Sequence, residues 1–172
     1  MTIAVGQNIP VSKKLDEKNG FKEFQIGDSF SKWQTNLTFN NSNGDKKYYT
    51  YTGSCCQKVF SIDLESIILG FKDNKLVLIY LETKTVKSES SGWVSSDYKL
   101  IKGSFEMLFG VKSPDIRSDD NSGNVASFWE GEKLFLDLKY EYMGVKQFGD
   151  NYTGSGRCGI LIALIVPLND GF

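Results

Sequence analysis

The amino-acid sequence predicts an α+β domain in which two helices pack on one face of an antiparallel sheet of about six to eight strands. Two segments repeat apolar residues at helical spacing, and several others have strand composition. Short turn sequences join neighbouring strand segments, which favours antiparallel hairpins. The 172 residues correspond to one ordinary domain, and 40% of them are hydrophobic, so the chain can bury a substantial core.

We expect residues 1–20 to be an N-terminal extension and residues 21–172 to form the domain. The first seven residues, MTIAVGQ, lack the basic and long apolar regions of a signal peptide. Their short apolar stretch nevertheless resembles the end of one. Two interpretations stay open: the remnant of an export signal, or an ordinary first segment or edge strand.

The first predicted helix follows Asp28, whose carboxylate is a suitable N-cap. Phe30, Trp33 and Leu37 recur on one helical face, so we expect them to be buried against the sheet. Residues 40–47, NNSNGDKK, are predicted to form a loop because polar and turn-forming residues fill them.

Three strands follow in the first half. Residues 47–52, KYYTYT, have strand composition. Residues 67–71 and 75–82 form a predicted hairpin with its turn at 72–74.

The second helix is predicted after a loop at residues 88–97, with Ser96 as its N-cap. Gly110 and Pro114 supply the expected stop signals. Its apolar face consists of Tyr98, Ile101, Phe105, Leu108 and Phe109.

The remaining sequence predicts loops at 113–124 and 149–156. Between them, residues 125–129 and 133–142 form a second hairpin, turned at Glu130-Gly131-Glu132. The Ile- and Val-rich residues 159–166 predict a buried terminal strand.

The opening FQIGDSFSKW, residues 24–33, resembles small exported bacterial domains of the β-lactamase inhibitor protein type and the outer-membrane assembly lipoprotein small protein A type. The resemblance covers residues 24–82 and, more faintly, 98–142. It implies two tandem units, each a helix followed by antiparallel strands. The lipidated cysteine of the lipoproteins has no counterpart near this N-terminus, and no functional residue carries over.

Charge and composition disfavour several functions. The 20 basic and 21 acidic side chains give a net charge of −1, so we expect no nucleic-acid partner. The longest apolar run, residues 160–168, is too short for a transmembrane helix. The chain has no histidine and therefore lacks the commonest general base and metal ligand, which lowers the expectation of an enzyme.

Three sequence features are compatible with a functional site, but none of them predicts one. Residues 154–159 read GxGxxG but precede a strand rather than a helix, so we predict a flexible loop and no dinucleotide. Asp119 to Glu130 has the length of a calcium loop, but its inner ligands are misplaced. We therefore expect no cofactor and no metal. Four carboxylates that an enzyme could pair are predicted to face solvent instead: Asp63, Glu65, Asp137 and Glu141.

The three cysteines are a candidate disulfide set. Either Cys55 or Cys56 can pair with Cys158 across two strands if the protein matures in an oxidising compartment. The alternative is three free thiols. Adjacent cysteines in an ordinary strand are poorly placed to pair with each other.

Aromatic residues are numerous enough to exceed what a core of this size needs. The candidate binding surface consists of Tyr49, Tyr51, Trp93, Trp129, Tyr140 and Tyr142. Core and rim packing is the alternative.

The sequence thus favours a non-enzymatic binding or accessory protein of the bacterial cell envelope, periplasmic or secreted, with another protein as its partner. One alternative is a cytosolic immunity or regulatory protein, and another is a carboxylate-dependent enzyme. An exposed aromatic sheet face would favour the binding protein, and a polar cleft with convergent carboxylates would favour the enzyme.

Overall fold

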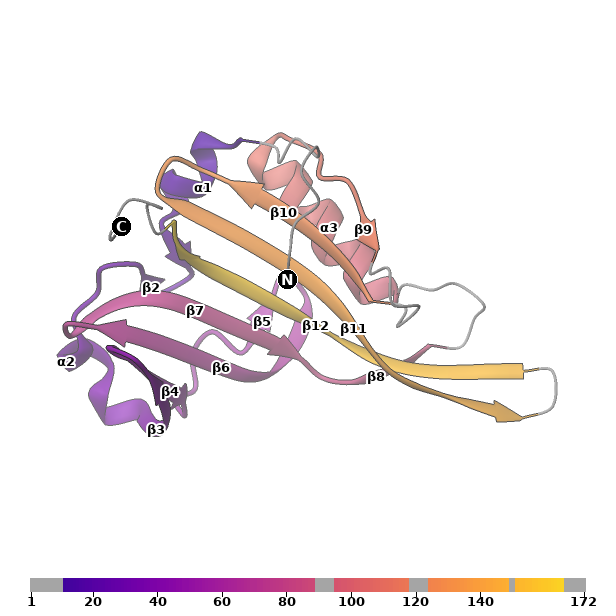
Figure 1. The fold of residues 1–172 in the computed structure, drawn as a ribbon, viewed down its shortest axis with the longest axis horizontal. Helices are drawn as coiled ribbons and strands as arrows, with labels where there is room; N and C mark the ends of the chain where they lie inside the picture. The colour runs from indigo at the N-terminus through magenta and orange to yellow at the C-terminus, as the bar shows by residue number, and fades with distance from the viewer. Residues whose placement is uncertain (1–10, 89–94, 118–123, 149–150, 166–172) are drawn as a thin grey trace.

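The computed structural model describes residues 11–88, 95–117, 124–148 and 151–165, and it has the predicted α+β class (Figure 1). Its helices are α1 (Lys13–Lys18), α2 (Phe30–Trp33), the 3-10 turn η1 (Gln34–Asn36) and α3 (Ser96–Phe109). Its strands are β1 (Gly20–Phe21), β2 (Phe24–Gln25), β3 (Leu37–Asn43), β4 (Lys46–Tyr51), β5 (Lys58–Val59), β6 (Ile62–Lys72), β7 (Lys75–Thr83), β8 (Val86–Ser88), β9 (Ile116–Arg117), β10 (Val125–Glu130), β11 (Leu134–Phe148) and β12 (Asn151–Leu164).

Across the described residues, the main sheet runs in the order β3-β4-β6-β7-β12-β11-β10-β9, with every neighbouring pair antiparallel. β5 pairs with β6, β8 pairs with β12, and β1 and β2 form a separate small sheet. The last strand, β12, lies between the hairpins β6–β7 and β10–β11 and so joins the two halves of the chain into one sheet (Figure 1). No described helix is both long and apolar enough to cross a membrane.

Helix α3 is present as the sequence predicts, except that its N-cap lies one residue earlier. Ser95 rather than Ser96 is the N-cap, and its hydroxyl accepts from the Tyr98 amide. Gly110 ends the helix with φ 74°, a conformation that suits glycine because it has no Cβ. The helix buries Tyr98, Ile101, Phe105 and Phe109 fully, and Leu108 only partly.

The first helix is much shorter than predicted. α2 has one turn and η1 one more, and Leu37 already belongs to β3. Ser29 takes the N-cap position, while the Asp28 carboxylate accepts from the Gln25 amide, Lys32 and the Trp33 indole. Trp33 is buried as predicted, whereas Phe30 and Leu37 are partly buried.

The predicted loop at residues 40–47 is confirmed only at Gly44 and Asp45, which form a turn, and is wrong for the residues on either side. β3 runs through Asn43 and pairs with β4, and the chain reverses at Gly44, where φ is 60°. Polar residues are tolerated in β3 because it is an edge strand whose side chains from Thr38 onward are exposed. Pairing with β4 satisfies its backbone on one side.

The predicted loop at residues 149–156 is also wrong from Asn151 onward, because β12 begins there. Glycine is required at position 156 because the Tyr140 ring occupies the space of a side chain there. A Cβ on Gly156 would lie 2.4 Å from the Tyr140 ring. The GxGxxG motif therefore forms part of a strand rather than a flexible loop.

Both predicted hairpins are confirmed. The β6–β7 turn places Asp73 and Asn74 at φ 50° and 58°, the two positive values of a type I′ turn. The β10–β11 turn includes Gly131, whose amide donates to the Leu134 carbonyl.

The boundary predicted at residue 20 falls too late. Leu15 of α1 is buried in the core with 1% exposure, and the Ser12 hydroxyl donates to the Phe109 carbonyl. The Asp16 carboxylate accepts from backbone amides of the β10–β11 turn. Residues from Val11 onward therefore belong to the folded domain, because they pack on α3 and on that turn.

Candidate functional site

The two faces of the sheet differ in how they are covered. α1 and α3 pack on the face that carries Ile79, Leu136 and Ile160, all at most 1% exposed. No described helix covers the opposite face at strands β6, β7 and β12 (Figure 1). We refer to it as the helix-free face.

Strand register aligns the side chains of the helix-free face. Ile68 of β6 lies opposite Tyr80 of β7, and Tyr80 lies opposite Leu161 of β12. Directly opposite residues point to the same face, so these side chains form one transverse row. All are half-buried, as is their neighbour Leu78.

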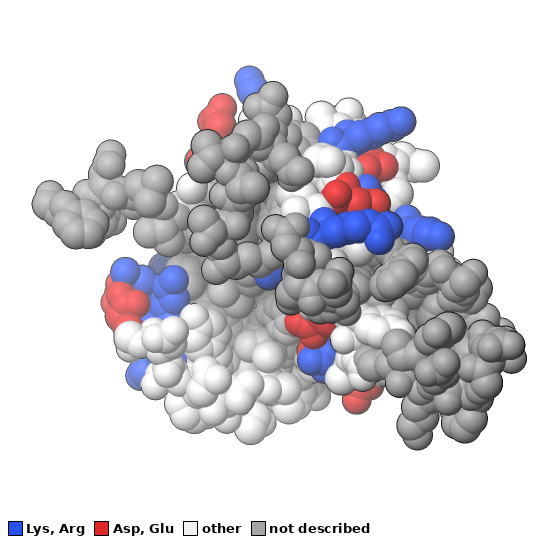
Figure 2. All heavy atoms as spheres, turned by 45° about the vertical axis from the view of Figure 1, so that its right-hand side comes forward, with Lys and Arg blue, Asp and Glu red and all other residues white. Residues whose placement is uncertain are grey.

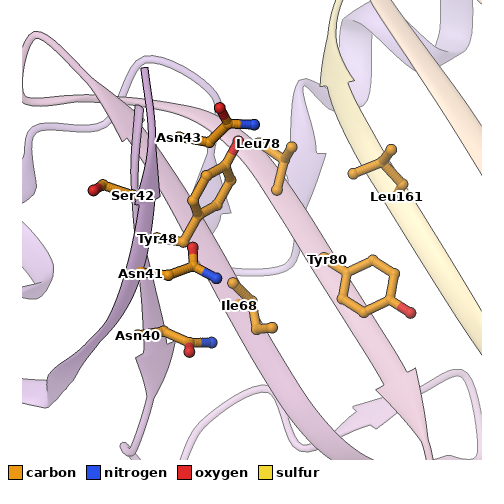
Figure 3. Close-up of a pocket in the computed structure, with 9 residues that line it drawn as sticks. All are labelled: Asn40, Asn41, Ser42, Asn43, Tyr48, Ile68, Leu78, Tyr80 and Leu161. Atoms are coloured by element: carbon orange, nitrogen blue, oxygen red, sulfur yellow. The ribbon is translucent and has the colours of Figure 1, made fainter. Parts of the chain in front are cut away.

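A hollow of about 440 Å³ opens on this face (Figure 3). β3 forms one wall and the strands β4, β6, β7 and β12 form the floor. In Figure 3, Asn41 and Asn43 lie beside the Tyr48 ring, whereas Ser42 points away from it. The lining residues are Asn40, Asn41, Ser42, Asn43, Tyr48, Ile68, Leu78, Tyr80 and Leu161, none of them charged.

Glycine lets both tyrosine rings of the hollow lie against the sheet. A Cβ on Gly70 would lie 3.1 Å from the Tyr48 ring, and a Cβ on Gly159 would lie 2.6 Å from the Tyr80 hydroxyl. The rings thus occupy space that any other residue would fill, which restricts their motion. Burial raises the pKa of Tyr80 to about 12, helped by Glu141 and Glu82, so its hydroxyl stays protonated at neutral pH.

Ion pairs border the hollow on the β11 side. Arg157 bridges Glu82 at 2.8 Å and Glu141 at 3.2 Å, and Lys139 pairs with Asp137 at 2.8 Å. Figure 2 shows acidic and basic side chains next to one another on the surface it displays. These carboxylates are matched by cations, so they do not converge as an acid–base pair.

Asp137 departs from the prediction that it faces solvent. It is only 6% exposed, and its Oδ1 has no hydrogen-bond partner among the residues that the structure describes. It lies opposite Leu161 and Phe128, whose side chains share the helix-free face. Burial raises the pKa of the Asp137 carboxyl, and Lys139 opposes the shift. Asp63 and Glu65 are exposed, as predicted, and Glu141 is half-exposed.

The aromatic residues predicted as a binding surface are mostly core residues. Trp129, Tyr140 and Tyr51 are 0%, 1% and 8% exposed, and Tyr49 and Tyr142 pack partly against the core. Strand alternation directs these side chains to the face that the helices cover. Trp93 lies outside the described residues.

Of the two alternatives left open for the cysteines, the structure has the free thiols: Cys55, Cys56 and Cys158 are all unbridged. Cys158 is fully buried in β12, where its amide donates to the Thr83 hydroxyl. Burial raises its pKa to about 12. Cys55 and Cys56 lie after β4, and their sulfurs are 2.8 Å apart.

The other motifs provide no site. Of residues 119–130, which have the length but not the ligand pattern of a calcium loop, residues 119–123 lie outside the described residues, and Glu130 ends β10 opposite Phe135. Among the residues that the structure describes, no three Cys, Asp or Glu side chains are grouped to hold a metal ion.

Sequence reasoning did not identify Tyr80 or the asparagines of β3 as site residues. A usable signal was present at residues 76–81, LVLIYL, which are apolar at every position. An antiparallel strand with one solvated face should alternate, so an unbroken run indicates burial on both faces. Residues 160–164, ILIAL, show the same pattern.

Comparisons with protein families, curated proteins and solved structures find no match to this chain.

Proposed function

We propose that this protein is a non-enzymatic binding protein whose helix-free face receives an extended, uncharged segment of another protein. One observation carries the proposal. Residues 76–81 of β7 and 160–164 of β12 are apolar on both faces of the sheet, yet the described helices cover only one of these faces. Half-buried apolar side chains beside a hollow are typical of a surface that a partner completes.

The edge strand β3 supports an extended partner. Its sequence, LTFNNSN, contains neither charge nor proline, and Phe39 is 57% exposed. Edge strands are usually protected against pairing by lysine, proline or bulges, and here only a bulge at Asn40 is present. A segment added along the free edge of β3 would place alternate side chains on the helix-free face, next to Asn41 and Asn43 of the hollow.

The chemistry of the hollow fits a protein partner. Tyrosine rings offer a large contact area at low entropic cost, and asparagine and serine adapt their hydrogen bonds to a partner. The uncharged lining matches an uncharged segment, because an unpaired charge would be costly to bury there.

The enzyme alternative has less support. Among the described residues that line the hollow there is no carboxylate, and the nearby Glu82 and Glu141 bind Arg157. We propose that binding takes place in the cell envelope, because residues 24–33 resemble the opening of small exported bacterial domains. The cytosolic regulatory alternative uses the same surface, and fractionating source cells with an antibody to the chain distinguishes the two compartments.

The test is a quantitative pull-down from the envelope fraction, followed by binding measurements with the purified captured protein. Tyr80→Ala removes a ring from the hollow, and Ser42→Lys adds a charge to the β3 edge while pointing away from the Tyr48 ring. The control is Met107→Ala, which removes an 84% exposed side chain from α3.

We expect the captured protein to bind at least about tenfold more weakly to both site variants, the loss expected for a contact worth more than about 1.4 kcal/mol. The control should bind like the wild type. A protein retained equally by all four baits would show that the helix-free face is not the binding surface. Loss with Tyr80→Ala but not with Ser42→Lys would keep the hollow and refute strand addition at β3.

A further inference from the structure

Cys55 and Cys56 lie in a turn that follows β4 rather than in a strand. Cys56 has φ 67°, and this turn conformation brings its sulfur to 2.8 Å from the sulfur of Cys55. In an extended strand, neighbouring side chains point to opposite faces, which would separate the two sulfurs. The turn therefore creates the contact that the sequence alone argued against.

The surroundings of the pair restrict what it can do. Both cysteines are partly exposed, so small reagents can reach them. The hydroxyl of Tyr51 lies 3.1 Å from the Cys55 sulfur, and the Tyr51 ring packs on Phe24 and Trp33. No further Cys, Asp or Glu among the described residues completes a metal site here, so the sulfurs have each other as their reaction partners.

We propose that Cys55 and Cys56 form a reversible two-electron redox couple, in which a low-molecular-weight disulfide such as oxidised glutathione converts the dithiol to a vicinal disulfide. One cysteine thiolate attacks the reagent, forms a mixed disulfide and releases one small thiol. The other thiolate then attacks the protein sulfur of the mixed disulfide and releases the second small thiol. Two protein S–H bonds and the reagent S–S bond are replaced by one protein S–S bond and two reagent S–H bonds.

Because the two cysteines are adjacent in the sequence, we expect their disulfide to be easily reduced and to stabilise the fold little. Adjacent Cα atoms are about 3.8 Å apart, below the roughly 4.4–6.8 Å usual for disulfides, and bridges outside that range are more easily reduced. The bridge encloses no chain between its two cysteines, so it adds little loop-closure stabilisation.

The experiment incubates the reduced, folded chain with excess oxidised glutathione and then counts free thiols and measures the intact mass. We expect three thiols to fall to one, with the loss of two hydrogens and no bound glutathione at the end point. Peptide mapping should place the bridge between residues 55 and 56, and a thiol reductant should restore three thiols. The Cys158→Ser variant, which has only Cys55 and Cys56, should lose both thiols on oxidation and regain both on reduction.

The single variants Cys55→Ser and Cys56→Ser provide the opposite control. Each lacks the resolving thiol, so each should retain glutathione on its remaining turn cysteine. Circular dichroism before and after treatment checks that every chain is folded. Wild-type protein that keeps three free thiols, accumulates glutathione adducts or forms intermolecular dimers would overturn the proposal.

Discussion

Replacing Asp137 by leucine should stabilise the protein at neutral pH. Asp137 is 6% exposed, and within the described part of the chain its Oδ1 has no hydrogen-bond partner. Its neighbours across the strands are Leu161 and Phe128. The carboxylate therefore bears a desolvation cost in apolar surroundings, and leucine would meet those neighbours without such a cost.

The expected size follows from two opposing contributions. A buried acceptor without a partner costs about 1–3 kcal/mol. The ion pair to Lys139 offsets part of this cost, but the Lys139 side chain is 39% exposed, so solvent screening limits the pair to at most about 1 kcal/mol. We therefore expect Asp137→Leu to raise the free energy of unfolding by about 1–2 kcal/mol at pH 7.

The gain should depend on pH in a defined direction. Burial raises the pKa of Asp137 above its unfolded value of 3.8, so the folded state holds this proton more tightly than the unfolded state. Wild-type stability should consequently fall as the pH rises from the unfolded pKa through the folded one. The advantage of the leucine variant should be small near pH 3.5 and reach its full size above that window.

Urea denaturation followed by tryptophan fluorescence measures the effect, because Trp33 and Trp129 are both buried. Glu65→Leu, at an exposed position of β6, is the matched control and should change stability by less than about 0.5 kcal/mol. The reasoning fails if Asp137→Leu destabilises the protein at pH 7, or if its effect is the same at pH 3.5 and pH 7.

Three further predictions concern stability and are measured by chemical denaturation. Phe105→Ala should cost about 3–5 kcal/mol, because the ring is 5% exposed and packs on two other core rings, whereas Met107→Ala on the same helix should stay within about 0.5 kcal/mol. If Phe105→Ala and Met107→Ala lowered the free energy of unfolding equally, the buried face of α3 would be misassigned. Asp16→Ala should cost about 1–2 kcal/mol, because its carboxylate accepts from backbone amides of the β10–β11 turn. Gly131→Ala places a Cβ 2.5 Å from that carboxylate, so the double variant should cost less than the sum of the two single losses, and strict additivity would contradict the contact. Tyr98→Phe should cost about 1–2 kcal/mol, because its hydroxyl hydrogen-bonds a buried serine and an aspartate; an unchanged midpoint would show that this network adds nothing.

Local interactions explain the parts of the fold that the sequence predicted well. Helix α3 is specified by residues three and four apart from Tyr98 to Phe109, and its end by Gly110. The β6–β7 turn is specified by Asp73 and Asn74, two residue types that tolerate positive φ. In each case the determining contacts lie within a few residues of one another.

The errors arose where distant segments decide the outcome. Residues 40–43 have loop composition, yet β4 provides a partner for their backbone and makes them a strand. Leu15 follows two lysines, and its burial depends on packing against elements more than 80 residues away in the sequence. The same holds for Trp129, whose role depends on which face of the sheet α3 covers.

The sequence by itself determined the α+β class, the long helix, both hairpins and the apolar character of the central strands. The tertiary structure alone decided that β12 lies between the two hairpins, which side of the sheet is helix-free, and that Tyr48, Tyr80 and the asparagines of β3 line one hollow. It also brought the Cys55 and Cys56 sulfurs into contact. The physical reason is that helix periodicity and turn conformation depend on neighbouring residues, whereas strand order, edge position and the covering of a sheet face depend on pairings between residues far apart in the chain.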